Sequence, residues 1–199
     1  MRLARLKLAI LAIACSAAPS LAGDVTVTSR NCAWCHGTSV QGFASAPRLA
    51  GQRPAYTMNQ LRDFRDHTRD NPRSQQYMWG AAEGLSFHTA RNLATYFSTL
   101  YPKAAGDGHI VLAAVGRAIY EEGFPEFNIV SCAACHGPNG EGIRQIPRLA
   151  GLSYSYLKKR LKEWGEGYHA TAEPPMPGVA RKLSANEIEA LASYLSFVR

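Results

Sequence analysis

Hydrophobic residues recur every three or four positions in several stretches of the chain, which is the spacing of an amphipathic helix. Two such stretches run from Arg53 or Pro54 to about Asp70 and from Ser153 to about Gly165. Closing helices are predicted to begin at Ser86 and Ser184, and a further helix covers His109 to Glu122. No stretch alternates long enough to predict a core strand, so the sequence predicts an all-α fold.

These helical stretches belong to an internal repeat. At an offset of 100 residues, Gly42 matches Gly142, and the Pro-Arg-Leu-Ala-Gly motif that begins at Pro47 matches the one that begins at Pro147. Farther along the chain the offset becomes 98, and the match continues to the end of both closing helices. Self-similarity over this length indicates a duplicated domain. We predict one domain over residues 23–102, a linker rich in Pro, Ala and Gly over 103–108, and a second domain over 109–199.

The first 22 residues have the pattern of an export signal. A basic start is followed by an apolar run and by Ser20-Leu21-Ala22, a site of small residues for cleavage. The apolar run is shorter than the ~20 residues that span a bilayer. Export to the periplasm is therefore predicted, and a lipid anchor at Cys15, which would give peripheral membrane association, is the alternative.

Cysteine usage narrows the chemistry. Outside the signal the chain has four cysteines, arranged as Cys32-Ala-Trp-Cys35-His36 and Cys132-Ala-Ala-Cys135-His136. Two disulfides or a zinc site are the alternatives for four cysteines in an exported chain, but neither requires a histidine after each second cysteine. Covalent haem attachment does require it. We expect two haem c groups bound through these cysteines, with His36 and His136 as axial ligands of the two irons.

The sequence resembles the cytochrome c4 family, and also the dihaem cytochrome subunits of periplasmic dehydrogenases. The resemblance rests on the two C-x-x-C-H motifs, the two P-x-L-A-G motifs, two distal methionines and the ending from Leu183 to Tyr194. It implies two tandem class I cytochrome c folds that face one another. The segment from Gly23 to Asn31 departs from the family pattern, because it is short and Val25 to Thr28 are poor helix formers. The sequence therefore leaves open whether the first domain has a packed opening helix.

The repeat also selects the distal iron ligands. Met78 matches Met176, and both precede the same pattern, x-Gly-x-Ala-x-x-Leu-Ser. Met58 matches Lys158, which cannot be an equivalent ligand, so Met58 is predicted to be a packing residue. A thioether ligand raises the reduction potential, as suits an electron carrier. His36 and Met78 fill both axial positions of one iron, and His136 and Met176 fill those of the other. Neither iron then has an open site, so enzyme chemistry is not expected.

Several residues around the haems have weaker assignments. The resemblance implies that the carbonyls of Pro47 and Pro147 accept a hydrogen bond from the haem histidines. Arg48 and Arg148 are candidates for haem propionates or for the solvated surface, and Tyr56 and Tyr156 for propionate contact or core packing. Four histidines lack a counterpart in the other repeat and are expected at the surface: His67, His88, His109 and His169. The alternative is that His67 or His88 is the second histidine ligand of a bis-histidine haem.

The predicted function is electron transfer through two haems. One hypothesis is a free shuttle between a quinol-oxidising complex and a terminal oxidase or reductase. A second is the electron-accepting subunit of a periplasmic dehydrogenase, and a third is a haem enzyme or gas sensor with an open iron. The modest excess of basic residues, 22 Lys and Arg against 15 Asp and Glu, does not indicate nucleic-acid binding. Residues 23–105 carry a net charge of +4 and residues 106–199 a net charge of zero, so the first domain is expected to meet an acidic partner.

Overall fold

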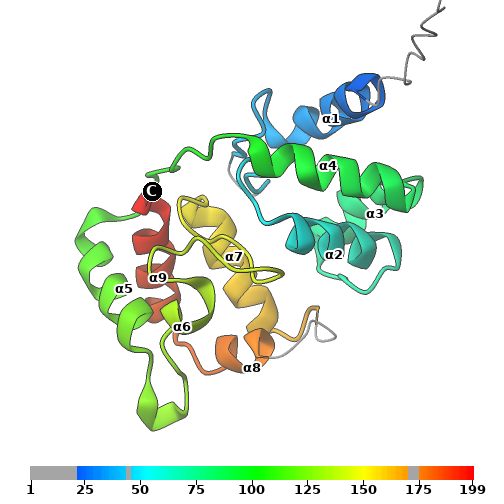
Figure 1. The fold of residues 1–199 in the computed structure, drawn as a ribbon. Helices are drawn as coiled ribbons and strands as arrows, with labels where there is room; N and C mark the ends of the chain where they lie inside the picture. Colours follow the sequence, from blue (N-terminus) through cyan, green and yellow to red (C-terminus); the bar gives the residue numbers. More distant parts are fainter. Residues whose placement is uncertain (1–21, 44–45, 170–174) are drawn as a thin grey trace, which may run out of the picture.

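The computed structural model describes residues 22–43, 46–169 and 175–199 as a helical protein (Figure 1). Within those ranges the only β pairing consists of three isolated bridges, so the predicted all-α fold is confirmed. No described helix is long and apolar enough to cross a membrane. The predicted export signal and Cys15 lie outside the described residues, except for Ala22, which begins the first helix.

Each half of the chain forms a small helical domain (Figure 1). In the first half the elements are α1 Ala22–His36, α2 Pro54–Arg65, the π-helical turn η1 Ser74–Met78, α3 Trp79–Glu83 and α4 Phe87–Thr99. In the second half they are α5 Ile110–Glu122, the 3₁₀ turn η2 Pro125–Phe127, α6 Ala133–His136, α7 Tyr154–Gly165, α8 Met176–Ala180 and α9 Ala185–Phe197.

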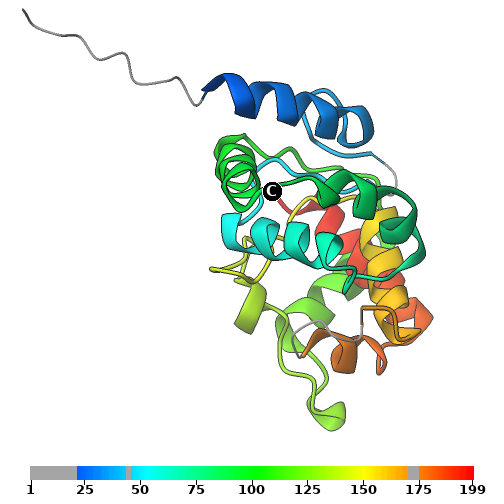
Figure 2. The same ribbon diagram turned by 90° about the vertical axis from the view of Figure 1, so that its right-hand side faces the viewer.

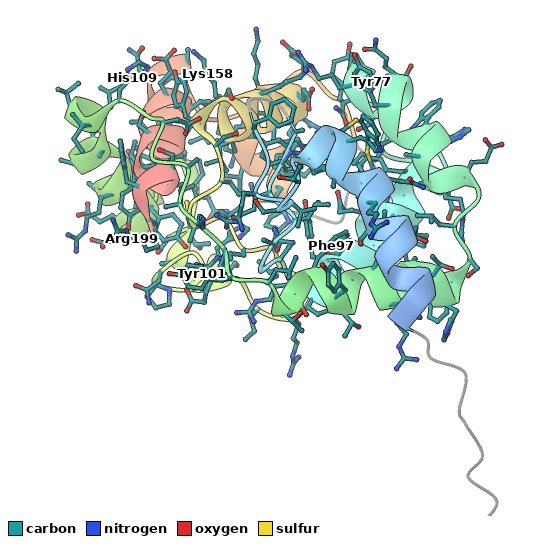
Figure 3. All side chains as sticks on the ribbon, turned by 90° about the horizontal axis from the view of Figure 1, so that it is seen from above. Tyr77, Phe97, Tyr101, His109, Lys158 and Arg199 are labelled. Carbon is teal, nitrogen blue, oxygen red and sulfur yellow. The ribbon has the colours of Figure 1, made fainter. Side chains whose placement is uncertain are left out.

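The two hydrophobic cores differ in size. In the second domain α5 and α7 both pack against α9, and Tyr120, Leu157, Leu191 and Leu195 are buried between them. The α5–α9 crossing is very close, since a Cβ atom on Gly116 would overlap the Ala190 carbonyl. In the first domain α2 and α1 pack against α4 around a smaller core, and Phe97 of α4 points into it (Figure 3).

The opening segment of the first domain is helical despite its composition. Val25 to Thr28 lie within α1, which runs without interruption into the Cys32–His36 motif and packs against α4 (Figure 2). In the second domain, by contrast, α5 and α6 are separate helices joined by η2. The later turn of α1, with Cys32 and Ala33, packs on the core around α4 and anchors a helix whose earlier residues have low helix propensity.

The helix predicted to reach about Asp70 ends earlier, at Arg65. The chain leaves the helix because His67 adopts a left-handed conformation, with φ 59°. The His67 amide then donates to the Phe64 carbonyl, and the Arg69 amide to the Asp63 carbonyl. These bonds satisfy the last carbonyls of α2 and turn the following loop toward the second domain.

The segment predicted as a linker is held by both domains. On the first-domain side, the Gln41 amide group donates to the Tyr101 carbonyl and accepts from the Lys103 amide, both at 2.9 Å. On the second-domain side, the Ala105 amide donates to the Gly151 carbonyl at 3.1 Å. Gly106 likewise donates to the Ser196 carbonyl at 2.9 Å. The segment therefore fixes the two domains against each other.

Candidate functional site

The two C-x-x-C-H motifs lie at equivalent places in the two domains. Cys32, Cys35 and His36 form the last turn of α1, while Cys132 precedes α6, which contains Cys135 and His136. Residues three apart on a helix share one face, so each cysteine pair presents two thiols to the same side. None of these four cysteines forms a disulfide. This is the arrangement that two thioether bonds to one porphyrin require.

Both motif histidines are oriented by the same contact. The His36 Nδ1 atom lies 2.7 Å from the Pro47 carbonyl oxygen, and His136 Nδ1 lies 3.0 Å from the Pro147 carbonyl oxygen. Because a carbonyl only accepts, Nδ1 carries the proton and Nε2 keeps its lone pair for a metal. Burial lowers the pKa of both imidazoles, and the hydrogen bonds to the prolines oppose this in part. The predicted hydrogen bonds from the two histidines to the Pro47 and Pro147 carbonyls are therefore confirmed.

A repeated loop brings each proline to its histidine. The Gly42 amide donates to the His36 carbonyl at 2.8 Å, and the Gly142 amide to the His136 carbonyl at 2.7 Å. Both glycines have positive φ, and a Cβ on Gly142 would lie 2.5 Å from the Pro147 carbonyl carbon. Only glycine fits this turn without displacing the proline carbonyl. The glycines that the repeat preserves therefore build the histidine support.

The candidate distal ligands lie at helix junctions. Met176 begins α8 and packs, partly buried, on the same core as Cys132. Met78 ends η1, is partly buried, and is followed at once by α3, whose turn packs against α2. Met58 lies within α2, and its counterpart Lys158 is on α7. Lys158 forms an ion pair with Glu189 and contacts Tyr154 beside His109, at the surface of the second domain (Figure 3).

The two matching arginines have different surroundings. Arg48 is buried between the domains and donates to the carbonyls of Lys103, Ala150 and Gly151, so of its two predicted surroundings the solvated surface is wrong. Burial and the neighbouring Arg148 lower its pKa to about 10. Arg148 is half-buried, and its Nε–H has no partner. Of the two arginines, Arg148 retains a free donor for a carboxylate.

Buried donors without partners test whether an acidic cofactor fits the protein. Among the described residues these donors are Arg69 Nε, Arg148 Nε and Trp164 Nε1. An unpaired buried N–H costs about 1–3 kcal/mol, so such groups normally have a partner in the assembled protein. The carboxylate-bearing propionates of haem supply acceptors of the required kind. The residues present therefore fit haem. The sequence pointed to Arg148, while Arg69 and Trp164 were missed because neither side chain is repeated in the other domain.

The predicted histidine locations are right for three residues and wrong for one. His67, His88 and His109 are exposed, as expected. His67 stacks on Trp79, with ring centroids 3.9 Å apart, and His88 lies in the first turn of α4. His169 is only 4% exposed and lies at the domain interface. Tyr56 and Tyr156 also meet at this interface, close to Arg69 and Arg160. Helical periodicity within one repeat carries no information about contacts between repeats.

A family model, related sequences and a solved structure all match this chain to c-type cytochromes. The model of the cytochrome c family, described as "Cytochrome c", matches residues 21–100 and 113–198. Cytochrome c4 of Stutzerimonas stutzeri is 34% identical over 202 residues, which cover 96% of this chain and 94% of that protein. A thiosulfate dehydrogenase electron acceptor of Stutzerimonas stutzeri strain A1501 is 34% identical over 88% of this chain and 82% of its own length. The solved structure of Acidithiobacillus ferrooxidans cytochrome c4 matches with a TM-score of 0.77 at 31% identity, over 84% of this chain and 98% of that chain.

Proposed function

Because this chain belongs to the cytochrome c family, with two such domains as in cytochrome c4, we propose that its two irons are ligated by His36 with Met78 and by His136 with Met176. The protein is a dihaem electron-transfer cytochrome with two covalently attached haem c groups. The observation that carries the histidine ligands is the matched pair of Nδ1 contacts, 2.7 Å at His36 and 3.0 Å at His136, while the methionine ligands rest on the repeat that matches Met78 with Met176. Both contacts leave Nε2 free to bind iron.

Each set of residues has its own part in holding a haem. Cys32 and Cys35 attach one porphyrin, and Cys132 and Cys135 attach the other. The haem supplies a one-electron iron couple when it is bound. The Pro47 and Pro147 carbonyls keep the histidine rings from rotating, and the methionine sulfurs favour ferrous iron. Held in this way by the chain, the histidine and methionine side chains would stay in place while the bound haem gains or loses an electron.

The cytochrome relatives are electron-transfer proteins, and we infer that this chain is likewise not an enzyme. With a histidine and a methionine on each iron, substrate oxygen, peroxide or carbon monoxide finds no vacant position. Mixing the reduced native protein with carbon monoxide tests this inference. An unchanged spectrum is expected, whereas formation of a carbon monoxide adduct without denaturant would favour a haem enzyme or gas sensor.

We propose that the protein works in the periplasm after removal of residues 1–22. The basis is the sequence of that segment, with its basic start, apolar run and Ser20-Leu21-Ala22 site. Covalent haem attachment to cysteines is compatible with an exported protein, where structural thiols are otherwise oxidised in pairs. Mass spectrometry of the protein isolated from cells is the test. A mature chain that begins at Gly23 supports the proposal, while a lipid on Cys15 would replace it with membrane anchoring.

For the partners we propose a free shuttle between a quinol-oxidising complex and a terminal oxidase or reductase. A second candidate, the electron-accepting subunit of a periplasmic dehydrogenase, is favoured by the relative named a thiosulfate dehydrogenase electron acceptor. Purification of the native protein at low salt distinguishes the two. A shuttle elutes alone, whereas a subunit elutes with a catalytic chain in fixed proportion.

Partner docking to the first domain is proposed at a cleft between α1 and α4. The cleft has a volume of about 360 Å³ and is lined in part by Arg30, Tyr96 and Tyr101. Lys103 is exposed beside it, and its amide is bound to the lining residue Gln41. Exposed cations beside aromatic rings suit an acidic protein surface. The cleft also adjoins the end of α1 that carries the haem cysteines, which shortens the path for an electron.

A further inference from the structure

Polar and charged side chains from both domains converge at the domain interface. They come from α2 and the loop after it in the first domain, and from α7 and the loop after it in the second. We call this set the interdomain cluster: Tyr56, Asp63, Arg69, Asn71, Tyr156, Arg160, Glu163 and His169. Five of its members are 4% or 5% exposed, namely Arg69, Asn71, Arg160, Glu163 and His169. Burial at this level makes each ionic contact costly to break.

The interdomain cluster follows the internal repeat. Tyr56, Asp63 and Arg69 match Tyr156, Glu163 and His169 at the offset of 100 residues. Each acid is contacted from the opposite domain, because Asn71 donates to Glu163 Oε1 at 3.2 Å and His169 Nε2 lies 3.7 Å from Asp63 Oδ2. The two repeats thus have an arginine at one position and a histidine at its counterpart. Of these two residue types, only histidine changes its charge near neutral pH.

His169 is held on three sides. Arg160 Nη2 donates to His169 Nδ1 at 3.1 Å, and the His169 amide donates to Asp70 Oδ1. Its backbone is left-handed, with φ 55°, which is uncommon for a residue other than glycine. The bond to Asp70 of the first domain maintains this conformation. A guanidinium can only donate, so Nδ1 is unprotonated and the single ring proton lies on Nε2, facing Asp63.

Protonation of the His169 ring would disrupt its contact with Arg160. The second proton would have to bind Nδ1, where the Arg160 guanidinium already presents an N–H. The charged groups that face the ring are Arg160 from α7, Asp63 from α2, and Arg69 and Asp70 from the loop after α2. Burial lowers the pKa of His169, Arg69 and Arg160 lower it further, and Asp63 opposes them. The docked interface therefore favours the neutral ring.

We propose that His169 is a proton-binding site that controls the docking of the two haem domains. Docking holds the His169 amide on Asp70 and the neutral ring between Arg160 of its own domain and Asp63 of the other, so a protonated ring moves away from Arg160 only by releasing that interdomain amide bond. The pKa of His169 in the folded protein lies below that of a free imidazole. The stabilisation of docking by the neutral ring is therefore fully present above about pH 6.5 and is lost as the pH falls through the pKa of His169 in the folded protein. The proposal does not depend on which methionines bind iron.

Hydrogen exchange on the oxidised holoprotein tests the proposal at about pH 7.5 and about pH 5, with protection factors corrected for the intrinsic rate. The reporters are two interdomain amides, Arg148 N–H on Gln52 Oε1 and His169 N–H on Asp70. The variant is His169→Gln, because glutamine can accept from Arg160 and donate to Asp63 but cannot be protonated. The control is His88→Gln, at an exposed histidine on α4.

In the wild-type protein and in His88→Gln, protection of the interdomain amides should fall by roughly tenfold on acidification, while amides inside α9 stay protected. In His169→Gln the Arg148 amide should keep its protection at both pH values. An equal fall in His169→Gln, or no fall in the wild-type protein, would overturn the proposal. If the variant does not fold, proton NMR of the wild-type ring decides. A midpoint below the ordinary 6.5, shared by the interdomain amides, supports the proposal, and an ordinary midpoint overturns it.

Discussion

Arg48 Nη1 donates a hydrogen bond of 2.8 Å to the carbonyl of Gly151, which joins the first Pro-Arg-Leu-Ala-Gly motif to the last residue of the second. The same guanidinium binds the Lys103 and Ala150 carbonyls. A motif that orients a haem histidine within each domain therefore also fastens the two domains together. The relative placement of the two domains therefore depends on Arg48, which is not a proposed iron ligand.

Replacement of Arg48 by alanine should weaken domain docking. It leaves several buried carbonyls without a donor, and a hydrogen bond to a charged group contributes about 1.5–3 kcal/mol. We expect a loss of roughly 2–4 kcal/mol in the free energy of unfolding and separate unfolding of the two domains in urea. Arg91→Ala, at an exposed site on α4, is the control and should change little. A single unshifted transition in Arg48→Ala would show that the contact does not hold the domains.

Replacement of Gly142 by alanine should alter one haem through the Pro147 carbonyl. The added Cβ would lie 2.5 Å from the Pro147 carbonyl carbon at a residue with φ 69°, so the loop must shift. Loss of the bond to His136 Nδ1 makes the imidazole a weaker donor to iron, and the potential of the second haem should rise. Redox titration should show one couple moved and one unchanged. Gly165→Ala is the matched control, since its Cβ would meet only ordinary contacts.

Salt should affect the two domains unequally. Residues 23–105 carry a net charge of +4 and residues 106–199 a net charge of zero. Screening should therefore slow electron exchange of the first haem with an acidic partner more than exchange of the second haem. Arg30→Glu should slow the first exchange and reduce its salt dependence, while Arg181→Glu, at an exposed site of the second domain, should leave it unchanged. Stopped-flow kinetics at several salt concentrations give the answer, and equal salt slopes for both haems would contradict the docking proposal.

The fold was largely predictable because helical periodicity and the repeat are local signals. The last helix begins after its N-cap residue Ser184, as predicted, and α7 has its predicted bounds. The end of α2 was not predictable, since it depends on the left-handed His67. The haem histidines and their prolines were found from motif spacing and resemblance. The buried positions of Arg48 and His169 were not, because they arise from contacts between repeats that no pattern within one repeat encodes.

The central claim is that each iron has one histidine and one methionine ligand. The most direct test is the far-red absorption band of ferric haem with methionine ligation, measured in Met78→Ala, Met176→Ala and Met58→Ala. Each of the first two should lose half the band, lower one reduction potential and bind carbon monoxide at one iron. Met58→Ala should keep the whole band and lose at most a few kcal/mol of stability. Loss of half the band in Met58→Ala, or a Met78→Ala protein with both irons closed to carbon monoxide, would contradict the account.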